Sequence, residues 1–169
     1  KKSNITMDAN ILIIDDEKDQ AELIAESLRN VGYTCSTAES GNKVIDIIRK
    51  DRIDVVITDL VMHDMDGMEI LKEIKEKVPD TEVILITGHG TDETAVISKQ
   101  KGAATYLTKP VDINILRAAV EKAVKDQNTV RSNIELHKQL EEKFGFDGIV
   151  GNSQQMHRIF NILKQIAST

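Results

Sequence analysis

The chain has 169 residues and a formal net charge of −6, because 22 Lys and Arg residues stand against 28 Asp and Glu residues. Its hydrophobic fraction of 40% and charged fraction of 30% are typical of a globular protein and exclude a disordered or collagen-like chain. No apolar run approaches the ~20 residues that span a bilayer, the first residues lack a signal-peptide core, and a single Cys35 excludes an internal disulfide. We therefore expect a cytoplasmic protein with no membrane partner, and the acidic balance argues against nucleic-acid binding by this chain itself.

Two kinds of hydrophobic pattern alternate from residue 11 onward. Short apolar runs rich in β-branched residues predict strands at 11–14, 34–38, 55–58, 83–87 and 105–107. Each run is followed by a stretch with helical spacing of apolar residues: Ala21 to Leu28, Val44 to Ile48, Met68 to Ile74, about 91–101, and a segment after Asp112. Five repeats of strand and helix predict an α/β fold with a parallel sheet covered on both faces.

Composition also divides the chain along its length. Both prolines precede residue 111, all three phenylalanines follow residue 143, and the stretch between them lacks Gly and Pro. We expect a tail at 1–8, a compact domain at 9–126, a linker helix at 127–144 that continues the fifth helix, and the start of a different module at 145–169.

Polar side chains gather where the predicted strands end. Asp15 and Asp16 follow the first strand, Asp59 follows the third, Thr87 ends the fourth and Lys109 follows the fifth. Because ligands of open parallel sheets bind outside the carboxyl ends of the strands, we expect these side chains to meet at one edge.

Such a set of side chains favours one kind of chemistry. Three neighbouring carboxylates repel one another unless a cation lies between them, and Mg²⁺ prefers carboxylate and carbonyl oxygens but takes only one or two protein carboxylates. A remaining carboxylate can attack a phosphoryl group to form an acyl phosphate. Lys109 and Thr87 are suitable groups to stabilise the phosphoryl oxygens.

These residues stand in motifs that resemble the receiver domain of bacterial two-component response regulators. The motifs are Asp15-Asp16; Asp59-Leu60-Val61-Met62-(x)3-Asp66-Gly67-(x)-Glu69; Thr87-Gly88-His89-Gly90; and Tyr106-Leu107-Thr108-Lys109-Pro110. The resemblance covers about residues 8–126 and implies a flavodoxin-like, doubly wound fold with five parallel strands in the order 2-1-3-4-5.

The same resemblance implies roles for individual residues. Asp59 would accept a phosphoryl group from a sensor histidine kinase, and Mg²⁺ would be held by Asp16, Asp59 and the Val61 carbonyl, with Asp15 acting through water. Lys109 would contact the acyl phosphate. Thr87 would move to bond it, and Tyr106 would rotate inward in the active state. The protein would then be a regulatory phosphoacceptor, not an enzyme with turnover on an external substrate.

One position departs from the receiver pattern. His63 stands where receivers usually have proline, which should loosen the loop after Asp59 without removing a metal ligand. We interpret His63 as an exposed loop histidine in preference to a metal ligand, Cys35 as a small core residue, and leave open whether His89 influences access to the phosphoryl site or faces solvent.

The end of the chain carries a second, shorter resemblance. Residues 146–156 and the apolar helical pattern after them resemble the opening of the ATPase module in activators of sigma-54 RNA polymerase. The P-loop pattern G-x-x-x-x-G-K-[ST] is absent, so we expect no ATP hydrolysis by that route. We expect a fragment of a longer regulator, with sigma-54 RNA polymerase and DNA contacted only through domains that this chain lacks.

Other interpretations of the motifs remain. Asp15 and Asp16 alone suit a helix cap equally well, and Lys109-Pro110 alone suits an ordinary loop. A haloacid-dehalogenase type of hydrolase needs D-x-D after its first strand, which Asp15-Asp16-Glu17 does not supply. A degenerate receiver that docks partners without phosphorylation should have lost part of the acidic pair, Asp59 or Lys109, yet this chain keeps all of them.

The predicted fifth helix is long enough to suggest assembly. A helix from Asp112 to Lys143 would extend ~48 Å at 1.5 Å per residue, and helical patterns beyond about 25 residues suggest a coiled coil. One heptad seam runs through Leu116, Val120, Ala123, Gln127, Val130, Ile134, His137 and Glu141. This weak seam predicts a homodimer through the linker helix, with a solitary solvated helix as the alternative.

Overall fold

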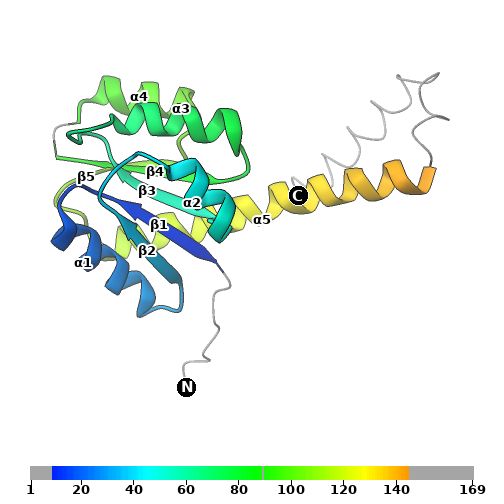
Figure 1. Ribbon diagram of the computed structural model, residues 1–169, viewed down its shortest axis with the longest axis horizontal. Coiled ribbons are helices and arrows are strands. Elements are labelled where there is room, and N and C mark those ends of the chain that lie inside the picture. Colours follow the sequence, from blue (N-terminus) through cyan, green and yellow to red (C-terminus); the bar gives the residue numbers. More distant parts are fainter. Residues whose placement is uncertain (1–8, 89, 145–169) are drawn as a thin grey trace. The chain divides into compact units, whose positions relative to one another are not determined.

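The computed structural model of the protein describes residues 9–88 and 90–144. Five strands and five helices alternate along the chain (Figure 1): β1 Asn10–Ile14, α1 Lys18–Arg29, β2 Thr34–Ala38, α2 Val44–Asp51, β3 Val55–Asp59, α3 Gly67–Lys77, β4 Glu82–Thr87, α4 Asp92–Gln100, β5 Thr105–Thr108 and α5 Ile113–Phe144. All strands pair in parallel, in the order β2-β1-β3-β4-β5. This confirms the predicted fold and strand order.

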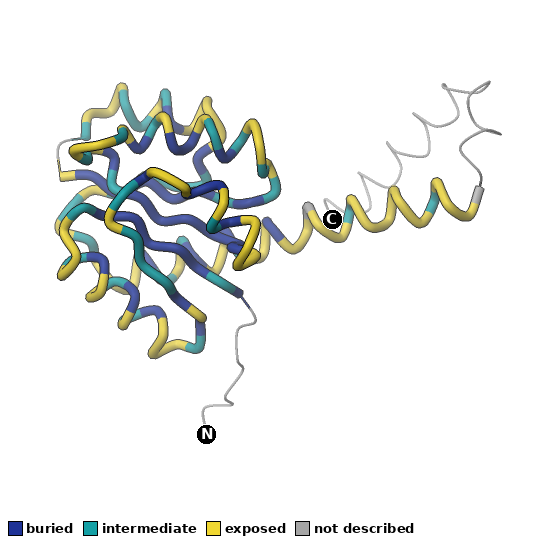
Figure 2. Tube along the Cα trace, viewed as in Figure 1, coloured by how far each residue is buried: buried dark blue, intermediate teal, exposed yellow. Residues whose placement is uncertain are grey.

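The central strands β1, β3 and β4 are buried on both faces of the sheet, as their dark colour in Figure 2 shows, whereas the edge strands β2 and β5 are largely half-buried. Ile11 and Ile13 of β1 face a core formed with α1 and α5, whereas Leu12 and Ile14 face a core formed with α2 and α3. Full burial of each large apolar side chain stabilises the folded state by ~1.5–3 kcal/mol. The predicted alternation of strand and helix therefore reflects two separate apolar layers on one sheet.

The amino end of β1 makes polar contacts with the end of α2 and with the residue that precedes β3. Asn10 donates from its backbone N–H to Asp54 Oδ2 at 2.7 Å, and from its side-chain amide to the Asp51 carbonyl at 3.0 Å. These contacts lie at the amino end of the strand, opposite the edge that carries the predicted site.

Helix α5 is a single helix of 32 residues, and the chain divides into two compact units after Gln127. The first four positions of the predicted seam, Leu116 through Gln127, are buried in the first unit. They are therefore part of the core of the first unit, and only later positions of the seam remain for an intermolecular contact. In residues 9–88 and 90–144, no helix is both long and apolar enough to cross a membrane.

Candidate functional site

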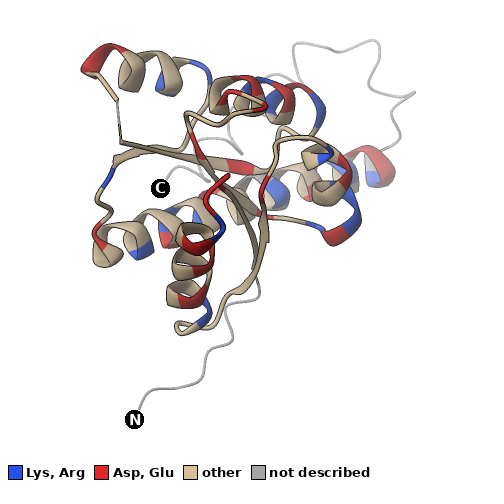
Figure 3. Cartoon of the chain, turned by 60° about the vertical axis from the view of Figure 1, so that its left-hand side comes forward, with Lys and Arg blue, Asp and Glu red and all other residues tan. Residues whose placement is uncertain are grey.

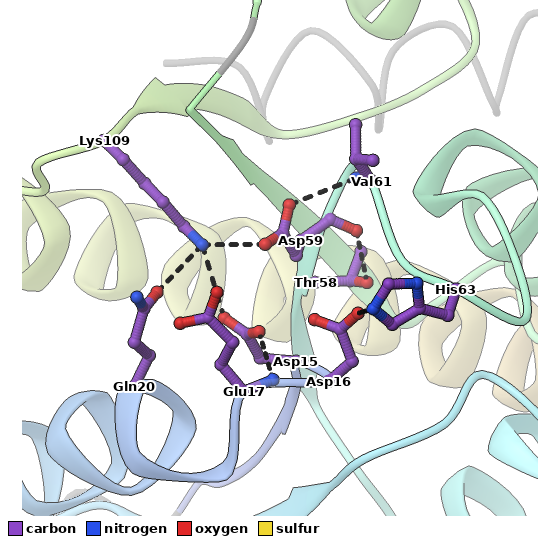
Figure 4. Close-up of polar contacts among 9 residues, drawn as sticks. All are labelled: Asp15, Asp16, Glu17, Gln20, Thr58, Asp59, Val61, His63 and Lys109. Atoms are coloured by element: carbon purple, nitrogen blue, oxygen red, sulfur yellow. Dashed lines mark hydrogen bonds and ion pairs between the residues drawn. The ribbon is translucent and has the colours of Figure 1, made fainter.

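The parallel register places the site residues at the same edge of the sheet. Ile14 pairs with Thr58, so the next residues, Asp15 and Asp59, lie side by side where β1 and β3 end. Thr87, the last residue of β4, pairs with Thr108, the last residue of β5, so Lys109 directly follows β5 beside the end of β4. Acidic segments lie at the strand ends near the centre of the view in Figure 3, and Figure 4 shows the side chains directed toward one another.

Three carboxylates form the acidic part of this edge. Asp15, Asp16 and Asp59 each offer an oxygen, and these oxygens all lie within 4.8 Å of one another. Asp15 is buried and the Asp59 side chain is only 11% exposed. Such a set of hard oxygen donors suits a divalent cation such as Mg²⁺, so the chemistry of the donors fits the expected metal.

Burial disfavours the charged form of the Asp15 side chain. Desolvation raises the pKa of Asp15, and the Glu17 N–H at 2.9 Å and the Lys109 ammonium only partly offset this effect. Glu17, not either aspartate, occupies the N-cap position of α1, and its side chain makes no cap hydrogen bond. The alternative that Asp15 and Asp16 serve to cap α1 therefore does not hold.

The raised pKa of Asp15 predicts a pH-dependent gain in stability for Asp15→Asn. The folded protein holds the Asp15 proton more tightly than the unfolded chain does. The contribution of Asp15 to the free energy of unfolding is therefore fully present at pH values below the pKa that Asp15 has in the unfolded chain, and it is lost as the pH rises through the pKa of Asp15 in the folded protein. In the absence of metal, we expect Asp15→Asn to have a higher Tm than wild type at pH 7, with a difference that narrows in acid. Thermal unfolding by circular dichroism over a pH series measures this.

Asp64→Asn is the control for this measurement, and we expect it to change Tm at neutral pH in the opposite direction to Asp15→Asn. A hydrogen bond from the Ser40 hydroxyl lowers the pKa of Asp64, so its charge stabilises the fold above the unfolded pKa. A lower Tm for Asp15→Asn at neutral pH would contradict the expected cost of the buried carboxylate.

Lys109 lies at the centre of the polar contacts. Its Nζ donates to Asp59 Oδ2 at 2.7 Å and to Gln20 Oε1 at 3.0 Å, and lies 3.5 Å from Asp15 Oδ2 (Figure 4). Burial alone would lower the pKa of Lys109, but the hydrogen bond to Asp59 and the charges of Asp15 and Asp59 outweigh burial and raise it. Lys109 therefore carries a full positive charge at neutral pH. The Lys109–Pro110 peptide bond is cis.

The loop after Asp59 is shaped by close backbone contacts. Val61 N–H donates to Asp59 Oδ1 at 3.1 Å, so both oxygens of Asp59 have a donor. Gly67 N–H donates to the Leu60 carbonyl, and a Cβ on Gly67 would lie 2.5 Å from the Asp59 carbonyl oxygen. Only glycine fits there, and Asp66 begins α3 by accepting a hydrogen bond from Met68 N–H.

His63 lies in this loop with its side chain 98% exposed, as expected of a loop histidine. Its Nε2 is 3.5 Å from Asp16 Oδ2, a contact that the sequence did not indicate (Figure 4). Cys35 is buried in β2 as predicted, and burial raises the pKa of its thiol to about 11. His89 lies outside the described residues.

Thr87 and Tyr106 are neighbours around Gly90. A Cβ on Gly90 would overlap the Tyr106 hydroxyl and lie 2.7 Å from the Thr87 methyl group. Thr87 is fully buried and Tyr106 is half-buried. The Tyr106 hydroxyl is 3.0 Å from Thr94 Oγ1, which also belongs to the capping box at the start of α4.

Sequence reasoning missed Gln20, Gly90 and Thr94. Gln20 precedes the buried Ala21 in the first turn of α1, close behind the aspartate pair, and that position was the available signal. Gly90 was quoted within a motif, but its role in making room for Tyr106 depends on the direction of that ring and could not be read from residue order.

Comparison with known proteins agrees with this geometry. Residues 11–121 match the family described as the response regulator receiver domain. The transcriptional regulatory protein GlrR of Escherichia coli K12 is 38% identical over 116 residues, 69% of this chain and 26% of GlrR. The DNA-binding transcriptional regulator NtrC of Salmonella typhimurium is 32% identical over 160 residues, 93% of this chain and 33% of NtrC. The chain thus spans a third or less of the length of these relatives.

A solved structure extends the comparison to three dimensions. The beryllofluoride-activated NtrC4 receiver domain dimer, determined in solution, has a TM-score of 0.67 and 32% sequence identity, and the match covers 70% of this chain and 98% of that chain. With the fold, the acidic edge and the family match in agreement, this chain belongs to the response regulator receiver domains of two-component signalling.

Proposed function

We propose that the chain is a phosphorylation-controlled switch in which Asp59 accepts a phosphoryl group from the phosphohistidine of a sensor histidine kinase. The observation that carries the proposal is the position of Asp59 between a partly buried ammonium 2.7 Å from one oxygen and a backbone N–H 3.1 Å from the other. In the transfer, an Asp59 oxygen bonds to phosphorus, the P–N bond breaks, and its electron pair returns to the imidazole of the kinase.

The carboxylates around Asp59 suit a Mg²⁺ ion. Asp16, Asp59 and the Val61 carbonyl would hold it directly and Asp15 through water, and Mg²⁺ bound there neutralises negative charge on the carboxylates and phosphoryl oxygens. The protein's own part is to fix Asp59 by its two donors and to present Lys109 to the phosphoryl oxygens. Intact-protein mass spectrometry after incubation with Mg²⁺ and a small phosphodonor tests this function.

The contacts around Gly90 support Thr87 and Tyr106 as the switch pair. A phosphoryl group adds about −1.5 to −2 charge at the sheet edge, and the Thr87 hydroxyl is the group we expect to move toward it. Tyr106 touches the same glycine and the cap of α4. Movement of Thr87 would therefore reach the surface of α4 through Tyr106.

We further propose that the receiver comprises residues 9–126, preceded by a tail at 1–8, and that residues 127–144 form a linker helix through which two copies pair. The solved NtrC4 receiver is a dimer, which supports pairing of two copies. Exposed apolar side chains in the second half of α5 support the linker helix as the surface through which they pair. Phosphorylation of Asp59 would change how the paired receivers control the ATPase of a sigma-54-dependent activator in the cytoplasm. The proposed ATPase start, 145–169, lies outside the described residues.

Ile134→Asp tests the linker dimer. Ile134 lies on the predicted seam and is 57% exposed, so a charge there should abolish pairing of the linkers. Leu136→Asp is the matched control, because Leu136 is 46% exposed but lies off the seam. We expect sedimentation velocity to show dimers for wild type and Leu136→Asp and monomers for Ile134→Asp, while equal behaviour of the two variants would exclude this seam.

A further inference from the structure

We infer that Gln20 is a positioning residue for phosphoryl transfer, which anchors the Lys109 ammonium above Asp59 without neutralising its charge. This inference rests on the proposed function of Asp59. It concerns a residue of α1 that no motif of the phosphorylation site includes.

The contact between the two side chains is well defined. Gln20 Oε1 lies 3.0 Å from Lys109 Nζ, with both side chains partly buried (Figure 4). Because an ammonium has three donors and no acceptor, the oxygen of the Gln20 amide must face it. Gln20 lies in the first turn of α1, and its side chain points to Lys109 in Figure 4, while the adjacent Ala21 is packed in the core.

Three acceptors match the three donors of the ammonium. Asp59 and Asp15 are charged, and both belong to the acidic set proposed to hold metal. Once a phosphoryl group and a metal engage these carboxylates, Gln20 is the one of the three that remains as a contact for Lys109. A lysine side chain loses rotamer entropy when it is ordered, so an anchor that persists through the reaction reduces the entropy that must be lost at the transfer step.

The chemistry of the amide is as important as its position. A glutamate at this place would hold the ammonium equally well but would add a negative charge beside an incoming phosphoryl anion. A neutral acceptor keeps the lysine in place and leaves its charge for the phosphoryl oxygens.

Two readouts separate this role from a general structural one. In wild type, the ¹⁵Nζ–H signal of Lys109, assigned by its loss in Lys109→Ala, should be protected from solvent exchange. In Gln20→Leu that signal should broaden, and phosphorylation of Asp59 by a small phosphodonor with Mg²⁺ should slow about 3- to 10-fold, as for one lost hydrogen bond. In Gln20→Glu the signal should persist while phosphorylation is still slowed.

Gln100→Leu is the matched control, because Gln100 is an exposed glutamine at the end of α4, and it should match wild type in both readouts. An unprotected Lys109 signal in wild type, a Gln20→Leu variant that keeps the wild-type signal, or one that keeps the wild-type rate would overturn the anchor. If wild type gains no phosphoryl group at all, the proposed function of Asp59 fails, while the Lys109 signal still decides whether Gln20 holds the ammonium.

Discussion

Asp59→Asn is expected to reduce the phosphoryl gain of the protein to background. The amide of asparagine is not a nucleophile comparable to a carboxylate. Asp59 is also the carboxylate that the Lys109 ammonium approaches more closely, at 2.7 Å against 3.5 Å for Asp15. Intact-protein mass spectrometry after incubation with Mg²⁺ and a small phosphodonor is the measurement. The fold should survive, because asparagine fills the same volume.

Two controls make this result specific. Asp64→Asn changes an exposed aspartate a few residues along the same loop and should gain a phosphoryl group as wild type does. Wild type treated with EDTA should gain none. An equal gain in wild type and Asp59→Asn would show that the acceptor is another residue.

Asp16→Ala and Lys109→Ala are expected to impair different steps: Asp16→Ala the binding of Mg²⁺, and Lys109→Ala the transfer of the phosphoryl group. Even at the dielectric constant of water, a dication about 4 Å from a carboxylate is attracted by ~2 kcal/mol, so Asp16→Ala should weaken Mg²⁺ binding by about 10- to 30-fold. Lys109→Ala removes a positive charge 2.7 Å from Asp59 Oδ2 and should bind Mg²⁺ no more weakly. Its phosphorylation should nevertheless be about 10²- to 10³-fold slower, as for loss of one group that stabilises transition-state charge.

Isothermal titration with Mg²⁺ and the time course of phosphorylation separate these two effects. At saturating Mg²⁺, Asp16→Ala should recover much of its rate, whereas Lys109→Ala should not. Loss of Mg²⁺ affinity in Lys109→Ala would show that the two roles are not divided between these residues as proposed.

Much of the fold was predictable because it depends on local patterns. The strand at β1 could be recognised from Ile11 to Ile14, since a run of apolar residues with no polar alternation is typical of a strand buried on both faces. The meeting of Asp15, Asp59 and Lys109 was predictable for a related reason: parallel strands bring their carboxyl ends together whatever the details of packing.

Contacts that depend on side-chain direction were not predictable in the same way. The pairing of Gln20 with Lys109 joins residues 89 positions apart and requires both the phase of α1 and the rotamer of a long side chain. The contact of Tyr106 with Thr94 depends on space left by Gly90. The pairing of His63 with Asp16 depends on a loop whose shape is set by Gly67, and residue order indicates none of these geometries.

The polar contacts of Asn10 have a consequence for the proposed phosphorylation site at the other end of β1. Ile11 through Ile14 are apolar on both faces, so sliding β1 by one residue would exchange its two sides and still leave three of its four core positions apolar. The same slide would carry Asp15 past Asp59 and separate the acidic set. Hydrophobicity alone therefore defines the alignment of β1 only weakly, and the bonds from Asn10 to the Asp51 carbonyl and the Asp54 carboxylate help to define it from the other end of the strand. The contacts of Asn10 therefore help to set the spacing of Asp15 and Asp59, the carboxylates of the proposed phosphorylation site, from the opposite end of β1.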